Sequence, residues 1–243
     1  MKTAIVTGAS AGIGRAVAEK LLASGWTVGL IARRAELLED IADRHEGAAF
    51  ALPADVTDEH AVEAAFKGFM DETGRLDCLF NNAGVFVPAA LIDEMPVADW
   101  TRAVDVNLTG MFLCARQAFG IMRHQDPRGG RIINNGSVSA YVPREGAAPY
   151  TATKHAITGL TRQLALDGRA FDVACGQIDI GNAMTDLLEG IVEAAQERGE
   201  VPPPSMDVSH VAESVLAMAE LPLSANVLFQ TIMATKMPFV GRG

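Results

Sequence analysis

The segment Thr7–Gly14 reads Thr-Gly-Ala-Ser-Ala-Gly-Ile-Gly and directly follows the β-branched and apolar run Thr3–Thr7. An amphipathic helical pattern then extends from Ile13 to Ala23. A strand that leads through a glycine-rich turn into a helix leaves main-chain amides and the positive end of the helix dipole free at the turn. The segment therefore predicts a site for the pyrophosphate of a dinucleotide.

Each glycine of the turn has a separate physical reason. Gly8 allows a sharp turn off the strand, Gly12 lets the backbone approach the pyrophosphate, and Gly14 lets the helix pack closely on the sheet. A glycine-rich turn without a ligand is the alternative, but the strand before it and the helix after it favour the nucleotide site. The predicted cofactor contacts in this segment are Gly8, Ser10, Gly12, Ile13 and Gly14.

The rest of the chain repeats the alternation of short apolar runs and longer amphipathic runs. This pattern is typical of βαβ units on a parallel sheet. Strands are expected at Thr3–Thr7, Val28–Ala32, Ala49–Leu52, Leu76–Phe80, Arg131–Asn134, Val173–Ile178 and Val227–Ile232. Helices are expected at Ile13–Ala23, Ala35–His45, Ala61–Glu72, Ala98–Arg123, Tyr150–Gly168, Thr185–Arg198 and Ser209–Ala219. The expected fold class is α/β: a single-domain Rossmann fold whose doubly wound, seven-stranded parallel sheet carries helices on both faces.

Length and composition are consistent with one catalytic domain that spans residues 1–243. A substrate-loop insertion is expected at about 183–207, where Pro202, Pro203 and Pro204 must break any helix. A C-terminal tail is expected at about 233–243. Its residues Met237, Phe239 and Val240 are apolar and predict a contact between subunits.

The net charge of −10 argues against a nucleic-acid surface, which would need a basic stripe. No apolar run is long enough to cross a bilayer, and the first strand begins at Thr3 without room for a signal peptide. We therefore expect a cytoplasmic protein without a membrane partner. Cys78, Cys114 and Cys175 are far apart and form no metal-binding pattern, which predicts buried free thiols and no metal site.

Four further motifs occur in order along the chain. They are Asn81-Asn82-Ala83-Gly84, Asn107 within Val106–Gly110, Ser137 after the fifth predicted strand, and Tyr150-x-x-x-Lys154. With the Thr-Gly-x-x-x-Gly-x-Gly turn, they resemble the classical short-chain dehydrogenase/reductase family from Thr3 to about Thr185. The resemblance implies that Asn82, Ala83 and Gly84 line the cofactor, and that Asn107 anchors a water in a proton relay.

The spacing of Tyr150 and Lys154 in the sequence indicates what the two side chains can do together. Tyr150 and Lys154 are four residues apart and share one face of a helix. An ammonium beside a phenol favours the phenolate, and so is expected to lower the phenol pKa from about 10 towards neutrality. Tyr150 is therefore the predicted general acid and base, and Ser137 the predicted donor to the substrate oxygen. The resemblance implies that Lys154 also binds the nicotinamide ribose, so Tyr150 and Lys154 are expected to contact the cofactor as well as to act in catalysis.

The end of the second strand bears on the choice of cofactor. The sequence Ala32-Arg33-Arg34 has no carboxylate for ribose hydroxyls, whereas a guanidinium matches a phosphate. NADP(H) is therefore favoured over NAD(H), although both arginines could be solvated loop charges, with Arg33 stacked on adenine. Asp55 and Val56 resemble the pair that contacts the adenine.

The segment after the sixth strand departs from the family. It reads Asp179-Ile180-Gly181-Asn182-Ala183-Met184-Thr185, without the usual proline before Gly181. Gly181 and Thr185 keep the Gly-x-x-x-Thr spacing, so Thr185 is expected to bind the nicotinamide carboxamide. Asn182 is expected to make a contact of its own, and Asp179 alone would be a turn carboxylate.

The sequence favours an NADP(H)-dependent oxidoreductase that acts on a small-molecule carbonyl or secondary alcohol. An NAD-dependent dehydrogenase of a sugar, polyol or hydroxy acid is the alternative, and a dinucleotide sensor without turnover is a third hypothesis. The helices Ala98–Arg123 and Tyr150–Gly168 correspond to those that build family oligomers, which predicts a homotetramer or dimer. Candidate pocket residues are Val138, Ser139, Tyr141, Pro143, Arg144, Glu145, Met184, Leu187 and Leu188.

Overall fold

The computed structural model describes residues 1–240, apart from the side chains of Asp186, Leu187, Ile191 and Ala194. The predicted pocket residue Leu187 and the tail residues 241–243 thus lie outside the described part. The strands of the main sheet are β1 (Thr3–Thr7), β2 (Thr27–Ala32), β3 (Ala49–Pro53), β4 (Cys78–Asn81), β5 (Gly130–Asn135), β6 (Val173–Ile180) and β9 (Phe229–Ile232).

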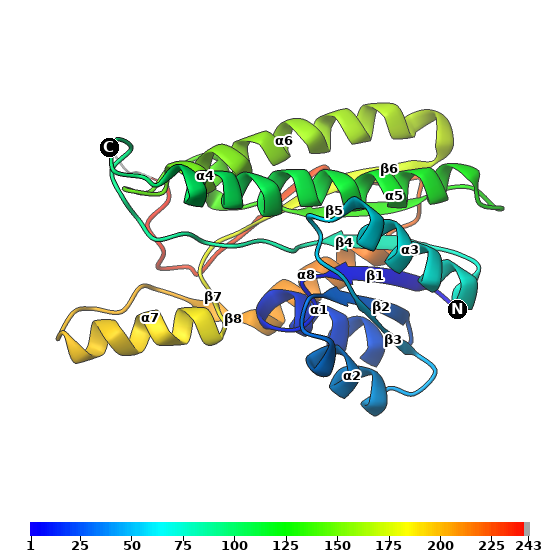
Figure 1. The fold of residues 1–243 in the computed structure, drawn as a ribbon, viewed down its shortest axis with the longest axis horizontal. Coiled ribbons are helices and arrows are strands. Elements are labelled where there is room, and N and C mark those ends of the chain that lie inside the picture. Colours follow the sequence, from blue (N-terminus) through cyan, green and yellow to red (C-terminus); the bar gives the residue numbers. More distant parts are fainter. Residues whose placement is uncertain (241–243) are drawn as a thin grey trace.

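The seven strands are all parallel, and they lie in the order β3-β2-β1-β4-β5-β6-β9. The helices are α1 (Gly12–Ala23), α2 (Ala35–Arg44), α3 (Glu59–Thr73), α4 (Val97–Val104), α5 (Met111–His124), α6 (Ala148–Gly168), α7 (Asp186–Glu197) and α8 (Val208–Glu220). The expected fold class is confirmed, and Figure 1 shows the helices as layers on the two sides of the sheet.

Alternate residues of β1 point to opposite faces of the sheet and belong to two separate hydrophobic cores. In β1, Ala4 and Val6 pack towards α1, α2 and α8, whereas Ile5 packs towards α3 and α5. This alternation is the period-two geometry of a strand that is covered on both faces. Because β1 pairs with β2 on one side and β4 on the other, the strand order reverses beside β1, and the crevice at the carboxyl ends opens there.

The prediction of one regular helix over Ala98–Arg123 is wrong. A π-helical segment, Asp105–Gly110, separates α4 from α5. Gly110 packs there against Val56, where a Cβ atom would lie 2.8 Å from Val56 Cγ2. The wider turn also buries the side chain of Asn107, and such π segments are frequent at functional sites.

The predicted insertion leaves and re-enters the fold at a single point. A two-stranded ladder of β7 (Ala183–Met184) and β8 (Met206–Asp207) joins its two ends, and α7 extends between them (Figure 1). Asn182 holds the proline segment, since its Nδ2 donates to the Pro204 carbonyl at 3.1 Å and its own carbonyl accepts from Met206 N at 3.0 Å. The expected contact of Asn182 is therefore confirmed.

Two of the three apolar tail residues from which a subunit contact was predicted are not free on the surface. Met237 and Phe239 are partly buried against their own chain, next to Gly181 and Tyr141. Val240 remains 92% exposed. The tail therefore covers part of the sheet edge of its own subunit, and its apolar residues do not by themselves require a second one.

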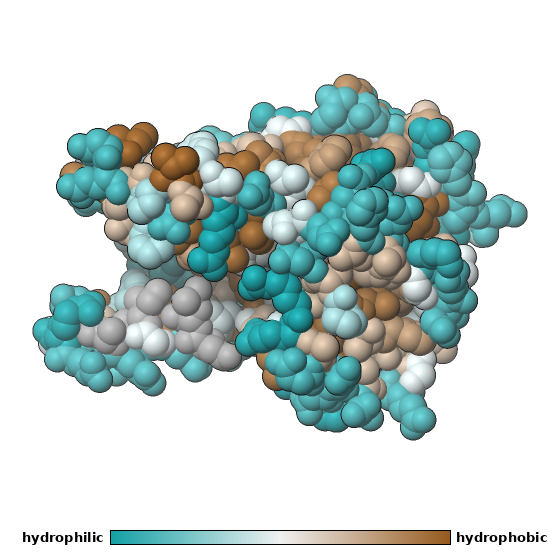
Figure 2. All heavy atoms as spheres, in the orientation of Figure 1, coloured by the Kyte–Doolittle hydropathy of each residue, from teal (hydrophilic) through white to brown (hydrophobic). Residues whose placement is uncertain are grey.

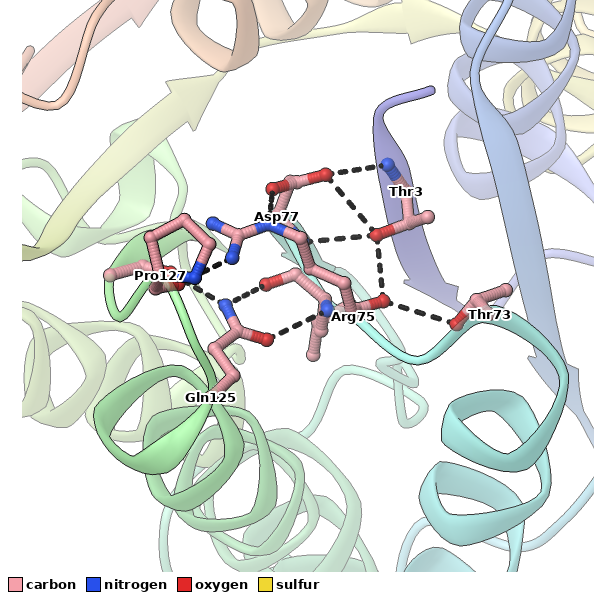
Figure 3. A network of polar contacts seen from close by, with 8 residues as sticks. Thr3, Thr73, Arg75, Asp77, Gln125 and Pro127 are labelled. Carbon is pink, nitrogen blue, oxygen red and sulfur yellow. Dashed lines mark hydrogen bonds and ion pairs between the residues drawn. The ribbon is translucent and has the colours of Figure 1, made fainter.

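The amino-terminal edge of the sheet is fixed by a polar network, shown in Figure 3. Asp77 Oδ2 accepts from Thr3 N at 2.9 Å, and Asp77 also pairs with Arg75, which donates to the Pro127 carbonyl. Gln125 bonds both main-chain groups of Leu76. These hydrogen bonds join the start of β1 to the segment before β4 and to the residue after α5, at the edge opposite the glycine-rich turn.

The three cysteines are buried and free, as the sequence predicts. Within residues 1–240, no helix has the length and apolar character needed to cross a membrane. The described side chains also contain no cluster of three or more His, Cys, Asp or Glu residues able to hold a metal ion.

Candidate active site

The glycine-rich turn has the geometry that its sequence predicts. Gly8 and Gly12 have φ angles of +69° and +53°, in the left-handed region that glycine tolerates best. A Cβ atom on Gly14 would lie 2.2 Å from the carbonyl oxygen of Gly8, so α1 packs directly on the turn. The turn therefore has the backbone shape that a phosphate site needs, at the start of α1, and its binding of a phosphate stays a prediction.

Thr7 connects this turn to the Asn-Asn-Ala-Gly segment, a role that the sequence reasoning missed. Its Oγ1 accepts from Asn82 N at 2.8 Å and from Ala83 N at 2.9 Å, and its carbonyl accepts from Asn82 Nδ2 at 2.9 Å. Asn82 Oδ1 in turn accepts from Asn135 Nδ2 at 2.8 Å. The carboxyl ends of β1, β4 and β5 are thereby held together around the crevice.

Asn107 is fully buried in the π-helical segment. Its Oδ1 accepts from Val85 N at 2.7 Å, and its Nδ2 donates to the Val85 carbonyl at 2.9 Å. A Cβ atom on Gly84 would lie 3.3 Å from Asn107 Oδ1. Asn107 therefore fixes the loop that follows the predicted cofactor segment, and its role in a proton relay stays a prediction.

Ser137, Tyr150 and Lys154 meet at the carboxyl end of β5. Ser137 follows the strand, and the two other residues lie in the first turns of α6. Lys154 Nζ donates to the Asn135 carbonyl at 2.7 Å and lies 5.5 Å from the centre of the Tyr150 ring. Phe86, which the sequence did not single out, stacks on the Tyr150 ring at 4.4 Å between centroids.

The pKa of Tyr150 is shifted in the direction opposite to the expected one. Burial raises the pKa of Tyr150, and the hydrogen bond with Ser137 and the charge of Arg144 act against it. Burial also lowers the pKa of Lys154 to about 8, against the opposing effect of Asp179. The expected lowering of the phenol pKa is therefore wrong, because desolvation of the phenolate is the largest effect on Tyr150.

The end of β2 faces the same turn. The Arg34 guanidinium donates to Ser10 Oγ at 3.0 Å, and both Arg33 and Arg34 are exposed. Asp55 Oδ1 accepts from Thr57 N and Oγ1, and Val56 is buried against Gly110. A carboxylate is absent from the end of β2, and a guanidinium lies beside the phosphate turn instead.

The segment after β6 lies over the turn. A Cβ atom on Gly12 would meet Thr185 Cγ2 at 3.4 Å, so Thr185 reaches the phosphate cradle. Gly181 N donates to the Ile232 carbonyl at 2.8 Å, and its α-carbon has no room for a side chain beside Met233 and Met237. Both residues of the Gly-x-x-x-Thr spacing thus lie at the crevice without the usual proline.

The surface is hollowed between the α7 insertion and the layer of α4, α5 and α6, as Figure 2 shows. Two predicted pocket residues, Pro143 and Arg144, line an open pocket of about 540 Å³ next to the first turn of α6. Its other lining side chains include Leu91, Ile92, Thr151 and His155. Tyr141 instead turns towards β6, where its hydroxyl donates to Asp179 Oδ2 at 2.9 Å.

Comparison with known proteins matches the family model "short chain dehydrogenase" to residues 2–196. A 3β-hydroxysteroid dehydrogenase of Mediterraneibacter gnavus is 35% identical over 191 residues, which are 77% of this chain and 68% of the relative.

The chain belongs to the classical short-chain dehydrogenase/reductase family. It is accordingly an oxidoreductase that acts on CH–OH and C=O groups with a nicotinamide cofactor.

Two solved structures share the fold at 24% identity. A 3-ketoacyl-(acyl-carrier-protein) reductase of Brucella melitensis, complexed with NADH, has a TM-score of 0.86 and matches 95% of this chain and 96% of its own. A serine dehydrogenase complexed with NADP+ has a TM-score of 0.88 and matches 99% and 98%, respectively.

Proposed function

We propose that the protein is an NADP(H)-dependent reductase of a small-molecule carbonyl, with Tyr150 as the general acid. The observation that carries this proposal is the meeting of Ser137, Tyr150 and Lys154 beside the phosphate turn, with the pKa of Tyr150 raised by burial. A phenol that keeps its proton at neutral pH is ready to donate it, as carbonyl reduction requires.

The residues of the turn fit a dinucleotide, because Gly12 places no side chain between the main chain and a ligand, and Gly14 lets α1 begin directly against Gly8. A bound NADPH would be held by Gly8, Ser10, Gly12, Ile13 and Gly14 and by the Asn82–Gly84 segment, and would supply the hydride. Ser137 and Tyr150 bind the substrate oxygen and stabilise the negative charge that develops there. Tyr150 then transfers its phenolic proton to that oxygen, and Lys154 stabilises the phenolate until solvent returns the proton.

The preference for NADP(H) rests on Arg34. Its guanidinium lies at 3.0 Å from Ser10 Oγ, at the end of a strand without a carboxylate. A guanidinium binds a phosphate through paired hydrogen bonds, so Arg34, with Arg33, would hold the 2′-phosphate of NADP(H). The serine dehydrogenase complex with NADP+ supports this choice, whereas the reductase complex with NADH keeps the alternative open.

Titration of the purified protein with NADPH and NADH, followed by nicotinamide fluorescence, tests the cofactor proposal. We expect NADPH to bind more tightly, and Arg34→Ala to weaken NADPH about ten- to hundredfold, because a charge-assisted bond is lost. NADH binding should hardly change. Arg33→Ala measures the contribution of the second guanidinium, and Arg44→Ala, an exposed arginine of α2 paired with Asp40, is the matched control.

Equal or tighter binding of NADH would overturn the preference for NADP(H). It would favour the NAD-dependent dehydrogenase of a sugar, polyol or hydroxy acid. Failure to bind either nucleotide would overturn the assignment of the turn itself.

The predicted homo-oligomer would use the outer faces of α5 and α6. Phe112 and Leu166 on these helices are 48% and 54% exposed, although both are large and apolar. We expect analytical ultracentrifugation to find a tetramer or dimer, and the double variant Phe112→Glu/Leu166→Glu to sediment as a smaller species, since the interface would have to bury unpaired carboxylates. A wild-type monomer would contradict the prediction.

A further inference from the structure

A carboxylate that the proposed mechanism does not use lies under the active site. Asp179, near the end of β6, is 0% exposed. Its Oδ1 accepts from Ser137 N at 2.9 Å and from Gln177 Nε2 at 2.7 Å, and its Oδ2 accepts from the Tyr141 hydroxyl at 2.9 Å. These are three neutral donors, and no described lysine or arginine forms an ion pair with it.

A buried cation lies close to this carboxylate. Lys154 is 3% exposed, and the hydrogen bond of its Nζ goes to the Asn135 carbonyl. Among the described side chains, no carboxylate forms an ion pair with it. Asp179 and Lys154 therefore stand buried on neighbouring elements, β6 and α6, where the attraction between a carboxylate and an ammonium is little screened by water.

The strand end is built around the carboxylate. A Cβ atom on Gly136 would lie 2.0 Å from Asp179 Oδ1, so the residue before Ser137 leaves space for the carboxylate. The Ser137 hydroxyl in turn accepts from Ser139 N at 3.1 Å, which continues the same turn. Displacing the carboxylate would therefore move the residue that is proposed to bind the substrate oxygen.

We propose that Asp179 is a positioning residue that fixes the main chain at Ser137 and supplies the counter-charge that keeps Lys154 protonated. This proposal rests on the proposed roles of Tyr150 and Lys154. It assigns a task to a residue that the sequence alone indicated only as a turn carboxylate.

The pKa shifts agree with this geometry. Burial lowers the pKa of Lys154 to about 8, and Asp179 raises it. Asp179 also raises the pKa of Tyr150, and burial together with Asp179 raises that of Tyr141 to about 12. The other charges around these groups are Arg144, which acts on Tyr150, and Arg162, which acts on Tyr141. Removing the charge of Asp179 therefore lowers the pKa of both Lys154 and Tyr150.

Asp179→Asn separates the charge from the hydrogen bonds. The amide oxygen can still accept from Ser137 N and Gln177 Nε2, and the amide nitrogen can donate to the Tyr141 hydroxyl. The active form in reduction carries protonated Tyr150 and Lys154, so the basic limb of kcat/KM should move to lower pH by about one unit. Tyr141→Phe keeps the charge, and its basic limb should stay at the wild-type pH.

A second readout needs neither cofactor nor substrate. Tyr141 and Tyr150 are the two tyrosines of the chain, so a Tyr141→Phe protein reports Tyr150 alone through phenolate absorbance in the near ultraviolet. We expect Asp179→Asn/Tyr141→Phe to form the phenolate at lower pH than Tyr141→Phe. Circular dichroism checks that each variant is folded.

An unchanged basic limb, or an unchanged phenolate titration in the double variant, would overturn the counter-charge proposal, even if turnover falls. Full turnover in Tyr150→Phe would instead overturn the proposed function. In that case the absorbance titration still tests the effect of Asp179 by itself, so the two failures are distinguishable.

Discussion

Tyr150→Phe is expected to reduce carbonyl turnover by about 10²–10⁴-fold, the range that a positioned general acid contributes. The phenyl ring keeps the stacking on Phe86 and the packing beside Lys154, so only the hydroxyl is lost. Steady-state kinetics with NADPH and a carbonyl substrate measure the loss, which should appear in kcat. Nucleotide binding should be retained.

The other tyrosine provides the matched comparison. Tyr141→Phe also removes one hydroxyl at the carboxyl edge, but this hydroxyl bonds Asp179. We expect a much smaller loss of turnover from this variant. A similar loss in both would contradict a specific acid role for Tyr150, and loss of nucleotide binding in Tyr150→Phe would point to a structural effect. If the wild-type protein bound a nicotinamide dinucleotide but turned over no substrate, this result would favour the dinucleotide-sensor hypothesis.

Gly14→Ala is expected to disable the phosphate turn. The new methyl group would lie 2.2 Å from the Gly8 carbonyl oxygen and 2.6 Å from Asn82 Nδ2, so backbone at the start of α1 must shift. Overpacking of this kind costs about 1–3 kcal/mol of folding free energy. Because the displaced atoms form the cradle, we expect NADPH affinity to fall at least tenfold as well, measured by nicotinamide fluorescence alongside thermal unfolding.

Gly68→Ala is the control for this substitution. Gly68 lies within α3, and a methyl group there would have Leu52 Cδ2 as its nearest neighbour, at 3.9 Å, which is an ordinary contact. Alanine is favoured over glycine in a helix by about 0.5–1 kcal/mol, so this variant should be slightly more stable and bind NADPH normally. A Gly14→Ala protein with unchanged affinity would show that the cofactor lies elsewhere.

Local chemistry explains why much of the fold was predictable. Buried strands covered on both faces give continuous apolar runs, such as Thr3–Thr7, and these runs were placed to within one or two residues. The turn at Gly8 and Gly12 was predictable because its positive φ angles need glycine. The positions of Ser137, Tyr150 and Lys154 were predictable from their motifs, and the structure brings these residues together.

Features that depend on distant parts of the chain were not predictable. The π-helical segment arises where Asn107 meets Val85, and no local pattern announces that contact. The sign of the Tyr150 pKa shift depends on burial by surrounding elements, which the helical spacing of Tyr150 and Lys154 does not reveal. The fold-back of Phe239 onto Tyr141 likewise joins residues far apart in the sequence. Spacing alone showed which residues meet, but not how strongly each is desolvated.

The ladder of β7 and β8 gives the insertion an independence that the rest of the chain lacks. Because its ends are tied together beside the crevice, the segment carrying α7 can grow or shrink while the sheet keeps its register. Lengthening such a loop raises the entropic cost of closing it only slowly, by about 0.6 kcal/mol per doubling. Under the proposed function, a change in the length of this segment would reshape one side of the substrate site, while Ser137, Tyr150 and Lys154 would keep their places on β5 and α6.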